Sequence, residues 1–592
     1  MKTVTNYLRP RIPAMSIGLT IKFAGTAVEL LLPWMLSVIL DKFVPLKDTN
    51  NIILWGGLMV LAAGGALSGN IIANRMATKV ARDFIREVRY DLFSKITDLS
   101  CAQIDRITVP SLISRLTSDS YNLHHLIDRM QRLGVRAPIL LIGGITITFM
   151  MEPVLTLVMI AVMPVLAAIV VFISKKGIRL YTKTQASLDV MIRRAQESIT
   201  GIRVIQALSK TEYEKERFSS ASTDVADNDY RSALLMNVTN PVMNVLLNFG
   251  LTLVVVVGAY RVNGGHTGPG TIVAFLSYFT IILNVVMMVS RIFVMLSKGV
   301  ASGRRIAEVL DAPREMETRE SAGAGDSIET GRAGGKGRAG GTERAEEQGS
   351  PAYIRFDDVS FSYSKVRNDV SNISFTLGKG EKMGIIGATG SGKTTLIQLL
   401  LRFYDPDSGA IYLDGKELST IPAEVLHTQF GVVFQNDFLY ADEISENIDI
   451  GRGLHTDRIV DAARNAQAAF IERRSDGFEG QIASGGMDLS GGQKQRLLIA
   501  RAIAAGPEIL LLDDSSSALD YKTDAALNRA LSEEYSGITK VIITQRVSAI
   551  LDADKILVLD DGQEIGFGTH EELMENCPTY REIAAYQMQE VV

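Results

Sequence analysis

The stretch KMGIIGATGSGKTTLIQLLLRF, residues 382–403, places an apolar run, a glycine-rich loop and a second apolar run in direct succession. The loop, Gly387 to Thr394, matches the pattern G-x-x-x-x-G-K-T in the strand–loop–helix context that the pattern requires. Its glycines allow backbone N–H groups to turn inward around a β-phosphate, and the helix N-terminus adds partial positive charge. We therefore expect a phosphate-binding loop in which Lys393 reaches the β- and γ-phosphates and the Thr394 hydroxyl binds Mg²⁺. A chance glycine-rich turn is the alternative. The later apolar run ILLLD, ending at a second expected Mg²⁺ partner, Asp513, argues against it.

Around this loop, strand-like runs alternate with helix-like stretches over residues 353–592. The strand-like runs are IRFDDVSFSY, KMGIIG, FGVVFQ, EILLLD, KVIIT and KILVLDDG. Such alternation is typical of an α/β domain built on a largely parallel sheet.

The N-terminal region, residues 1–311, has a different pattern. Spanning a bilayer takes about 20 apolar residues as a helix. No residue is charged between Asp48 and Arg75, and between Arg136 and Lys175 only Glu152 is. Uncharged runs of this length argue against the alternative of a large soluble helical core. We predict six membrane helices, at roughly 14–41, 52–74, 133–151, 154–174, 237–260 and 271–296.

Charge and composition limit the partners and suggest an orientation. The net charge of −5 gives no basic field for nucleic acid, and the two cysteines are not in a metal-ligand spacing. The N-terminus shows no signal-peptide pattern. Residues 75–132 hold ten Lys or Arg, and 175–231 are also basic. The positive-inside rule therefore predicts a multi-pass protein of the plasma (inner) membrane, with the N-terminus and the α/β domain cytoplasmic.

Between these regions, residues 312–352 are rich in Gly, Ala and charged residues, and within 322–350 Ile328 is the one large apolar residue. Such a composition cannot bury a core, so we expect a flexible tether, the alternative being a concealed binding motif.

A further motif, LSGGQKQR at residues 489–496, is the most specific element of the sequence. Together with the phosphate loop, Gln435 in VVFQ and SALD at 517–520, it resembles the nucleotide-binding domain of ABC transporters. The resemblance covers essentially the whole chain and implies an exporter-type half-transporter that binds ATP and Mg²⁺ and acts as a translocase. SRLTSD (114–119) and residues 197–218 are similar to the family's cytoplasmic loops, whose short coupling helices press on the nucleotide-binding domains.

The resemblance assigns roles to individual residues. Tyr363 would stack on adenine, and Gln435 would join Thr394 and Asp513 around Mg²⁺. The other ATP-binding residues would be Gly387, Thr389, Gly390, Ser391, Gly392, Lys393 and Thr395. Ser517 and Asp520 would form the D-loop. Ser490, Gly491, Gly492 and Gln493 would act in trans, because a helix N-terminus of this kind is an anion site with no phosphate of its own to bind. Two chains would then pair head to tail around two ATP molecules.

The sequence departs from the family at the positions that carry catalysis. Asp514 stands where the family usually has the Glu that polarises the attacking water. Its carboxylate retreats by about 1.5 Å, one bond length. Losing the reach of a general base forfeits roughly 10²–10⁴-fold in rate, or about 3–5 kcal/mol. Gln545 replaces the usual His and cannot carry a proton. Ser484 replaces an acid before the signature, which puts in doubt the usual contact with a coupling helix.

These departures favour the degenerate-site half of a heterodimer that exports lipophilic or multidrug-type substrates, with a second half-transporter supplying the hydrolytic residues. The alternatives are an ordinary homodimer, a dedicated lipid or peptide exporter, and a non-transporting ATP-binding regulator. Membrane lipids and a hydrophobic small molecule are the other expected partners.

A few polar residues of the spans are candidates for the substrate cavity. Glu29 could attract cationic amphiphiles, although a structural pair with Lys22 on the same helix face, or a polar lining residue, is the favoured interpretation. Asn248 shares a face with Asn244. The sixth span offers Asn284 and Arg291 among the methionines Met287, Met288 and Met295. Met-rich surfaces adapt to varied ligands, but such side chains also serve plain packing.

Overall fold

The computed structural model describes residues 2–313 and 352–589. These residues form two compact units. The first takes in the described residues up to Asp98 and from Ile107 to Pro313, and the second takes in Leu99–Arg106 and the described residues from 352 onward. Nearly all of the expected tether, 312–352, lies outside the described residues, so that expectation stays a prediction.

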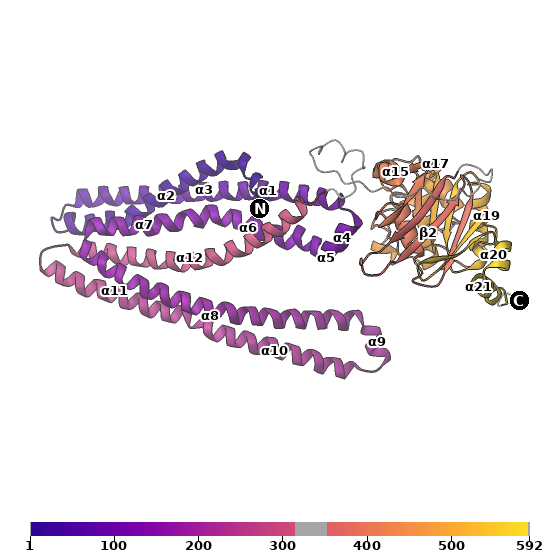
Figure 1. Cartoon of the computed structure of the whole chain (residues 1–592). Helices are drawn as coiled ribbons and strands as arrows, with labels where there is room; N and C mark the ends of the chain where they lie inside the picture. The colour runs from indigo at the N-terminus through magenta and orange to yellow at the C-terminus, as the bar shows by residue number, and fades with distance from the viewer. Residues whose placement is uncertain (1, 314–351, 590–592) are drawn as a thin grey trace, which may run out of the picture. The chain divides into compact units, whose positions relative to one another are not determined.

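The first unit is entirely helical, as expected (Figure 1). Its helices are α1 (Lys2–Asn6), α2 (Ile12–Val38), α3 (Thr49–Thr97), α5 (Val109–Ser114), α6 (Ser120–Arg129), α7 (Val135–Met151), α8 (Pro153–Thr200), α9 (Ile202–Ala207), α10 (Thr211–Asn237), α11 (Thr239–Asn263) and α12 (Pro269–Leu310). Short helical turns complete it at η1 (Arg9–Arg11), η2 (Ile39–Phe43), η3 (Arg115–Asp119) and η4 (Met130–Gly134).

Within the described residues, five helical stretches are long and apolar enough to cross a membrane: Lys2–Phe43, Thr49–Thr97, Val109–Met151, Thr211–Asn263 and Pro269–Val286. The span predicted at 154–174 falls in α8, where the described apolar stretch, Pro153–Val165, is shorter. A tight turn at Glu152 separates the third and fourth predicted spans. This residue is extended between α7 and α8, and its carboxylate pairs with Arg261 at 2.9 Å.

Small residues bring the first two long helices together. A Cβ on Gly25 of α2 would lie 3.3 Å from the carbonyl oxygen of Ala66 and 3.4 Å from the amide nitrogen of Asn70 on α3. Gly69 faces the Cα atom of Gly25 from the other side. Small residues at such a crossing let the two backbones approach closely. Inside a bilayer the hydrophobic effect does not drive helices together, so this close packing is what stabilises their association.

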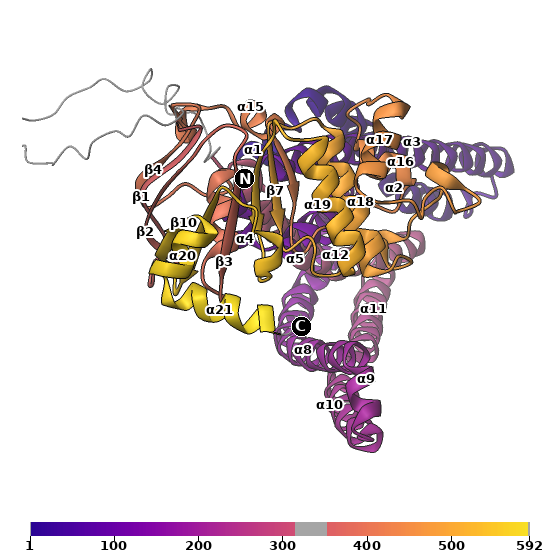
Figure 2. The same ribbon diagram turned by 90° about the vertical axis from the view of Figure 1, so that its right-hand side faces the viewer.

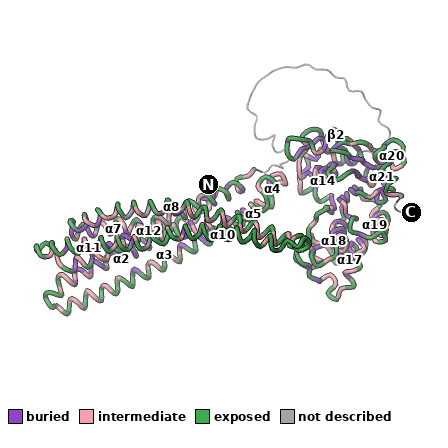
Figure 3. Tube along the Cα trace, turned by 90° about the horizontal axis from the view of Figure 1, so that it is seen from below, coloured by how far each residue is buried: buried purple, intermediate pink, exposed green. Residues whose placement is uncertain are grey.

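Helices continue beyond the membrane spans into both long basic loops. Helices α8 and α10 pack antiparallel as a long hairpin with the short helix α9 at its tip (Figure 1). In the other loop, the short helix is α4 (Cys101–Ile107), whereas SRLTSD forms the end of α5 and the π-helical turn η3. Figure 3 shows that residues far along the α8–α10 hairpin are mostly exposed.

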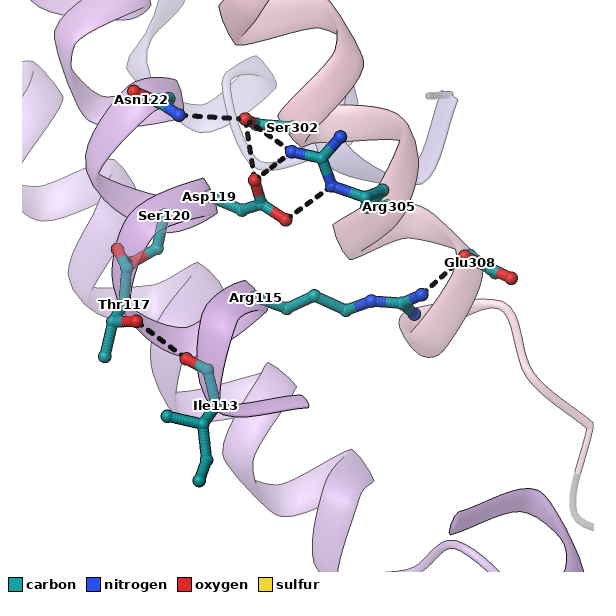
Figure 4. Close-up of polar contacts among 9 residues, drawn as sticks. All are labelled: Ile113, Arg115, Thr117, Asp119, Ser120, Asn122, Ser302, Arg305 and Glu308. Atoms are coloured by element: carbon teal, nitrogen blue, oxygen red, sulfur yellow. Dashed lines mark hydrogen bonds and ion pairs between the residues drawn. The ribbon is translucent and has the colours of Figure 1, made fainter. Parts of the chain in front are cut away.

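A polar cluster joins η3 and α6 to the last turns of α12 (Figure 4). The buried Asp119 carboxylate accepts hydrogen bonds from Ser302 Oγ at 2.8 Å and from Arg305 Nε at 2.8 Å. Asn122 Nδ2 donates to Ser302 Oγ at 3.2 Å. These bonds hold the C-terminal end of α12 against α6.

The second unit contains two sheets. The antiparallel sheet has the order β2-β1-β4-β5, and the other has the order β10-β9-β3-β8-β7-β6. The strands are β1 (Ile354–Phe361), β2 (Val370–Leu377), β3 (Lys382–Gly387), β4 (Ser408–Leu413), β5 (Lys416–Glu417), β6 (Phe430–Val433), β7 (Ile509–Asp513), β8 (Thr539–Ile543), β9 (Lys555–Asp560) and β10 (Gln563–Gly568). Strands β9, β3, β8, β7 and β6 pair in parallel, which confirms the predicted sheet type. The antiparallel sheet was not predicted, although its strand β1 was.

Helices cover the parallel sheet. They are α14 (Lys393–Leu400), α15 (Ala423–Thr428), α16 (Ile444–Asp449), α17 (Thr456–Asn465), α18 (Gly491–Ala504), α19 (Tyr521–Glu533), α20 (His570–Asn576) and α21 (Pro578–Gln589), with α4 grouped in the same unit. Alternate residues of β7 enter two cores. Leu510 and Leu512 pack with α18 and α19, whereas Ile509 and Leu511 pack with α14 and the antiparallel sheet. Figure 2 shows the ribbons of α18 and α19 on one side of the strand β7. This alternation is why the ILLLD run is apolar throughout.

Candidate nucleotide-binding site

The register of the parallel sheet brings three strand ends together. Ile543 of β8 pairs with Ile385 of β3 on one side and with Asp513 of β7 on the other. The loops that follow β3, β7 and β8 therefore leave the sheet at the same edge, where ligands bind in open α/β sheets.

A cavity of about 240 Å³ lies at this edge. It is lined by Asp369, Thr389, Gly390, Gly392, Lys393, Thr394, Thr395, Gln435, Asp513, Asp514, Ile543, Thr544 and Gln545. Residues predicted from separate motifs, from Thr389 to Gln545, thus share one site. Asp369, Ile543 and Thr544 were not predicted as site residues. Asp369 belongs to no quoted motif, whereas Ile543 and Thr544 end the quoted run KVIIT.

The phosphate loop has the conformation that its glycines permit. Gly390 and Gly392 have φ angles of 83° and 92°, a region that other residues avoid. A Cβ on Gly392 would lie 2.6 Å from Val370 Cγ1. Lys393 Nζ donates to the carbonyl oxygens of Gly387 at 2.8 Å and Ala388 at 2.6 Å. Its burial lowers the pKa of the ammonium group, so an incoming phosphate would stabilise the charged form.

The predicted Mg²⁺ partners are in contact. Thr394 Oγ1 donates to Asp513 Oδ2 at 3.0 Å, and Gln435 lines the same cavity. Burial raises the pKa of the Asp513 carboxyl, and a cation would reverse that shift. A hydroxyl, a carboxylate and an amide oxygen are the hard donors that Mg²⁺ takes, so these residues fit the ion.

Asp514 lies beside these groups with its backbone fixed on both sides. Its φ of 49° is left-handed, and its N–H donates to Ile543 O at 2.9 Å. Its carbonyl accepts from Ser517 Oγ at 2.9 Å and from Gln495 Nε2 at 3.3 Å. Burial raises the pKa of the Asp514 carboxyl, an effect that the charges of Arg546 and Lys393 oppose. Gln495 was within the quoted signature but was given no role.

Gln545 is held by a residue that the sequence analysis missed. Gln587 of α21 donates from Nε2 to the carbonyl of Gln545 at 2.7 Å and accepts from the Val547 N–H at 2.8 Å. One amide side chain thus spans the loop after β8. No motif contains Gln587, so no local signal could have identified it.

The signature residues do not line this cavity in the part of the chain that is described. Ser490 caps α18, where its Oγ accepts from the Gln493 N–H at 3.3 Å and Gln493 Oε1 accepts from the Ser490 N–H at 2.9 Å. This capping box leaves the N–H groups of Gly491 and Gly492 pointing beyond the helix. In the D-loop, Asp520 caps α19, and the hydrogen bond from the Thr523 N–H lowers the pKa of its carboxyl.

The predicted ATP-binding residues Tyr363 and Ser391 do not line the cavity. The hydroxyl of Tyr363 donates to Gln398 of α14, and the Tyr363 ring meets Tyr404 edge-on at 5.0 Å. Ser391 lies under the loop, 3.4 Å from Lys393 Nζ.

The candidate residues of the spans are mostly in structural contacts. Glu29 pairs with Arg136 of α7 at 2.7 Å, whereas Lys22 donates to Asn74 at 3.0 Å. Glu29 therefore has a structural partner, but not the one expected. Asn248 donates to the carbonyl of Asn244 at 2.8 Å. The side chains of Met287 and Arg291 lie outside the described residues.

A helical membrane unit joined to a P-loop ATPase unit with a capped signature helix defines an ATP-driven membrane transport protein. Residues 15–286 match the family model of the ABC transporter transmembrane region, and residues 370–517 match that of the ABC transporter. The uncharacterized ABC transporter ATP-binding protein YfiB of Bacillus subtilis is 34% identical over 586 residues, 98% of each chain. Rv1273c of Mycobacterium tuberculosis, also an uncharacterized ABC transporter ATP-binding protein, is 30% identical over 589 residues, 98% of this chain and 97% of that one.

The fold has a solved counterpart. A bacterial Atm1-family ABC exporter with ATP bound superposes with a TM-score of 0.77 at 22% identity, covering 98% of each chain. The chain therefore belongs to the ABC transporter family, as a half-transporter of the exporter type whose ATPase domain drives transport.

Proposed function

We propose that this chain is the ATP-holding half of a heterodimeric exporter of lipophilic small molecules in the plasma (inner) membrane. Its own site binds MgATP and hydrolyses it slowly. Its signature helix completes the site of a second half-transporter that supplies Glu and His. The N-terminus and the ATPase unit lie on the cytoplasmic side.

The fixed backbone of Asp514 carries this proposal. Hydrogen bonds hold its N–H and its carbonyl, so the chain cannot move forward to offset the missing methylene. The carboxylate ends about 1.5 Å short of the position that a Glu would reach. A general base needs hydrogen-bond distance to the water that it activates.

Gln545 adds to the deficit. Its side chain can donate to a phosphate oxygen but cannot take up a proton or carry a charge. The binding groups are retained by contrast, because Lys393, Thr394 and Asp513 all line the cavity and Thr394 donates to Asp513. A site that retains its binding groups and loses its catalytic reach is suited to hold ATP as a clamp.

The signature supports a role in trans. The N-terminus of α18 offers N–H groups and partial positive charge, yet none of its four signature residues lines the cavity of its own chain within the described residues. ATP bound between two such units would favour their closed arrangement. Transport then follows as a shift between inward- and outward-facing states, reset by hydrolysis at the partner's site.

The test is ATP turnover of this chain alone and with the partner, whose catalytic Glu is intact or replaced by Gln. Activity that needs both the partner and its Glu supports the proposal. Ordinary turnover by this chain alone refutes it and indicates a homodimer with competent Asp514 and Gln545. ATP-dependent accumulation of substrate in inverted vesicles separates an exporter from a regulator, which would show none.

A further inference from the structure

A second and larger cavity, of about 640 Å³, lies within the membrane unit. It is bordered by α6 and η4 on one side and by α12 on the other, and its lining includes Tyr121, His125 and Arg129 together with Asn284, Met288 and Lys298. Its α12 lining runs from Asn284, inside the span predicted at 271–296, to Lys298, just beyond that span. The cavity therefore reaches the end of the predicted span.

The charged groups of this cavity are all basic. Arg129 and Lys298 line it, and no Asp or Glu does among the described residues. Neither cation has a hydrogen bond or ion pair in the described part of the chain. The neighbouring acid, Asp128, is already paired with Arg132 at 3.0 Å and lies 3.3 Å from Thr78 Oγ1.

A buried polar atom also lacks a partner here. His125 Nδ1 is buried without a hydrogen bond, while the ring meets Tyr121 edge-on with centroids 4.2 Å apart. An imidazole nitrogen can donate to an anionic oxygen. A buried imidazole nitrogen without a hydrogen bond is costly unless a ligand meets it, and the two exposed, unpaired cations beside it are free to meet an anion.

The remaining wall is apolar and adaptable. Met288, Ile292 and Met295 of α12 line it across from Arg129 of α6, and thioether side chains fit chains of varied shape. The alternative of a cationic ligand has less support. Its expected anchor, Glu29, is already neutralised by Arg136 at 2.7 Å.

We propose that this cavity binds an amphiphile with an anionic headgroup, a phosphate or a carboxylate. Arg129 and Lys298 meet the head, and the methionine face of α12 meets the adjoining chain. The inference rests on the proposed export function, whose substrate class it narrows.

The test uses the full chain in phosphatidylcholine nanodiscs without nucleotide. The probes are two diazirine-bearing hexadecyl amphiphiles with fixed opposite charges, a phosphate monoester and a trimethylammonium, and adducts are mapped by peptide mass spectrometry. We expect the phosphate probe to label α6 and α12 at least about tenfold more than the ammonium probe, the effect of one charge-assisted contact.

Matched variants separate charge from folding. Arg129→Glu with Lys298→Glu should reverse the preference, whereas Arg129→Lys with Lys298→Arg should keep it. Arg75→Gln, which removes an exposed cation of α3 outside the cavity lining, should leave it unchanged. Equal labelling by both probes, or a preference that survives the double reversal, overturns the inference.

A further arm identifies the source of the headgroup. If phosphatidylglycerol in the disc suppresses the labelling, the ligand is a membrane lipid; if labelling persists, the ligand is a free amphiphile. Because no step needs hydrolysis, failure of the heterodimer proposal in the turnover assay leaves this result intact, and the converse also holds.

Discussion

Replacing Asp514 by Glu should raise ATP turnover at this chain's own site. The change adds one methylene and advances the carboxylate by about 1.5 Å. The backbone around it is held by the Ile543 carbonyl at 2.9 Å, Ser517 Oγ at 2.9 Å and Gln495 Nε2 at 3.3 Å. The added length is therefore directed into the cavity rather than absorbed by the main chain.

The size of the gain follows from the role of a general base. Full general-base catalysis is worth about 10²–10⁴-fold, or about 3–5 kcal/mol of barrier. Gln545 still cannot carry a proton, so we expect a gain below this range, about 10–100-fold. Adding Gln545→His should increase the rate further.

The assay is phosphate release by the purified chain in lipid, with bound ATP measured in parallel so that rates are expressed per occupied site. Asp514→Asn, equal in size but not a base, is the control and should stay at or below the wild-type rate. A Glu variant that binds ATP normally and hydrolyses it no faster than wild type would refute the reasoning about reach.

Other consequences can be measured on the same preparations. Because burial raises the pKa of Asp513, its carboxylate becomes protonated at a higher pH than that of an exposed Asp. As the pH of a binding titration is lowered, MgATP affinity should therefore begin to fall at a higher pH than an exposed Asp would give. The Asp513→Asn variant should bind MgATP more weakly than wild type, with an affinity that is nearly independent of pH. Gln587→Leu removes both hydrogen bonds to the loop that carries Gln545 and should lower ATP turnover about fivefold, near 1 kcal/mol, while ATP affinity is unchanged. An equal fall in ATP affinity and in turnover would contradict this expectation. Asp119→Ala leaves Arg305 without its buried partner and should cost about 1–3 kcal/mol, seen as a lower thermal midpoint; an unchanged midpoint would show that the cluster contributes nothing.

The sequence predicted those features whose causes are local. The phosphate loop, its flanking strand and helix, and the parallel sheet follow from glycine spacing and apolar runs of five or six residues. Long uncharged stretches predicted the membrane helices for the same reason. The composition of the site could be predicted because the motifs lie at the ends of neighbouring strands, as the pairing of Asp513 with Ile543 shows.

Features that depend on distant contacts could not be predicted. Glu29 and Arg136 are 107 residues apart, and Gln587 is 42 residues from Gln545. Nothing in the periodicity of either segment indicates these pairs. The short helix α4 of the first loop lies at Cys101–Ile107, ahead of the quoted run at 114–119, and no sequence motif marked it.

The π-helical turns η3 and η4 have a consequence for how this transporter could change its selectivity. They enclose α6, a ten-residue helix that carries Tyr121, His125 and Arg129. Each wide turn accommodates one residue more than an α-helix would, and each residue advances a helix by about 100°. Deleting a single residue from one turn would therefore rotate the whole face of α6 relative to α5 or α7. A single-codon deletion could exchange every side chain that α6 presents to the cavity, a change that point substitutions would reach only in several steps.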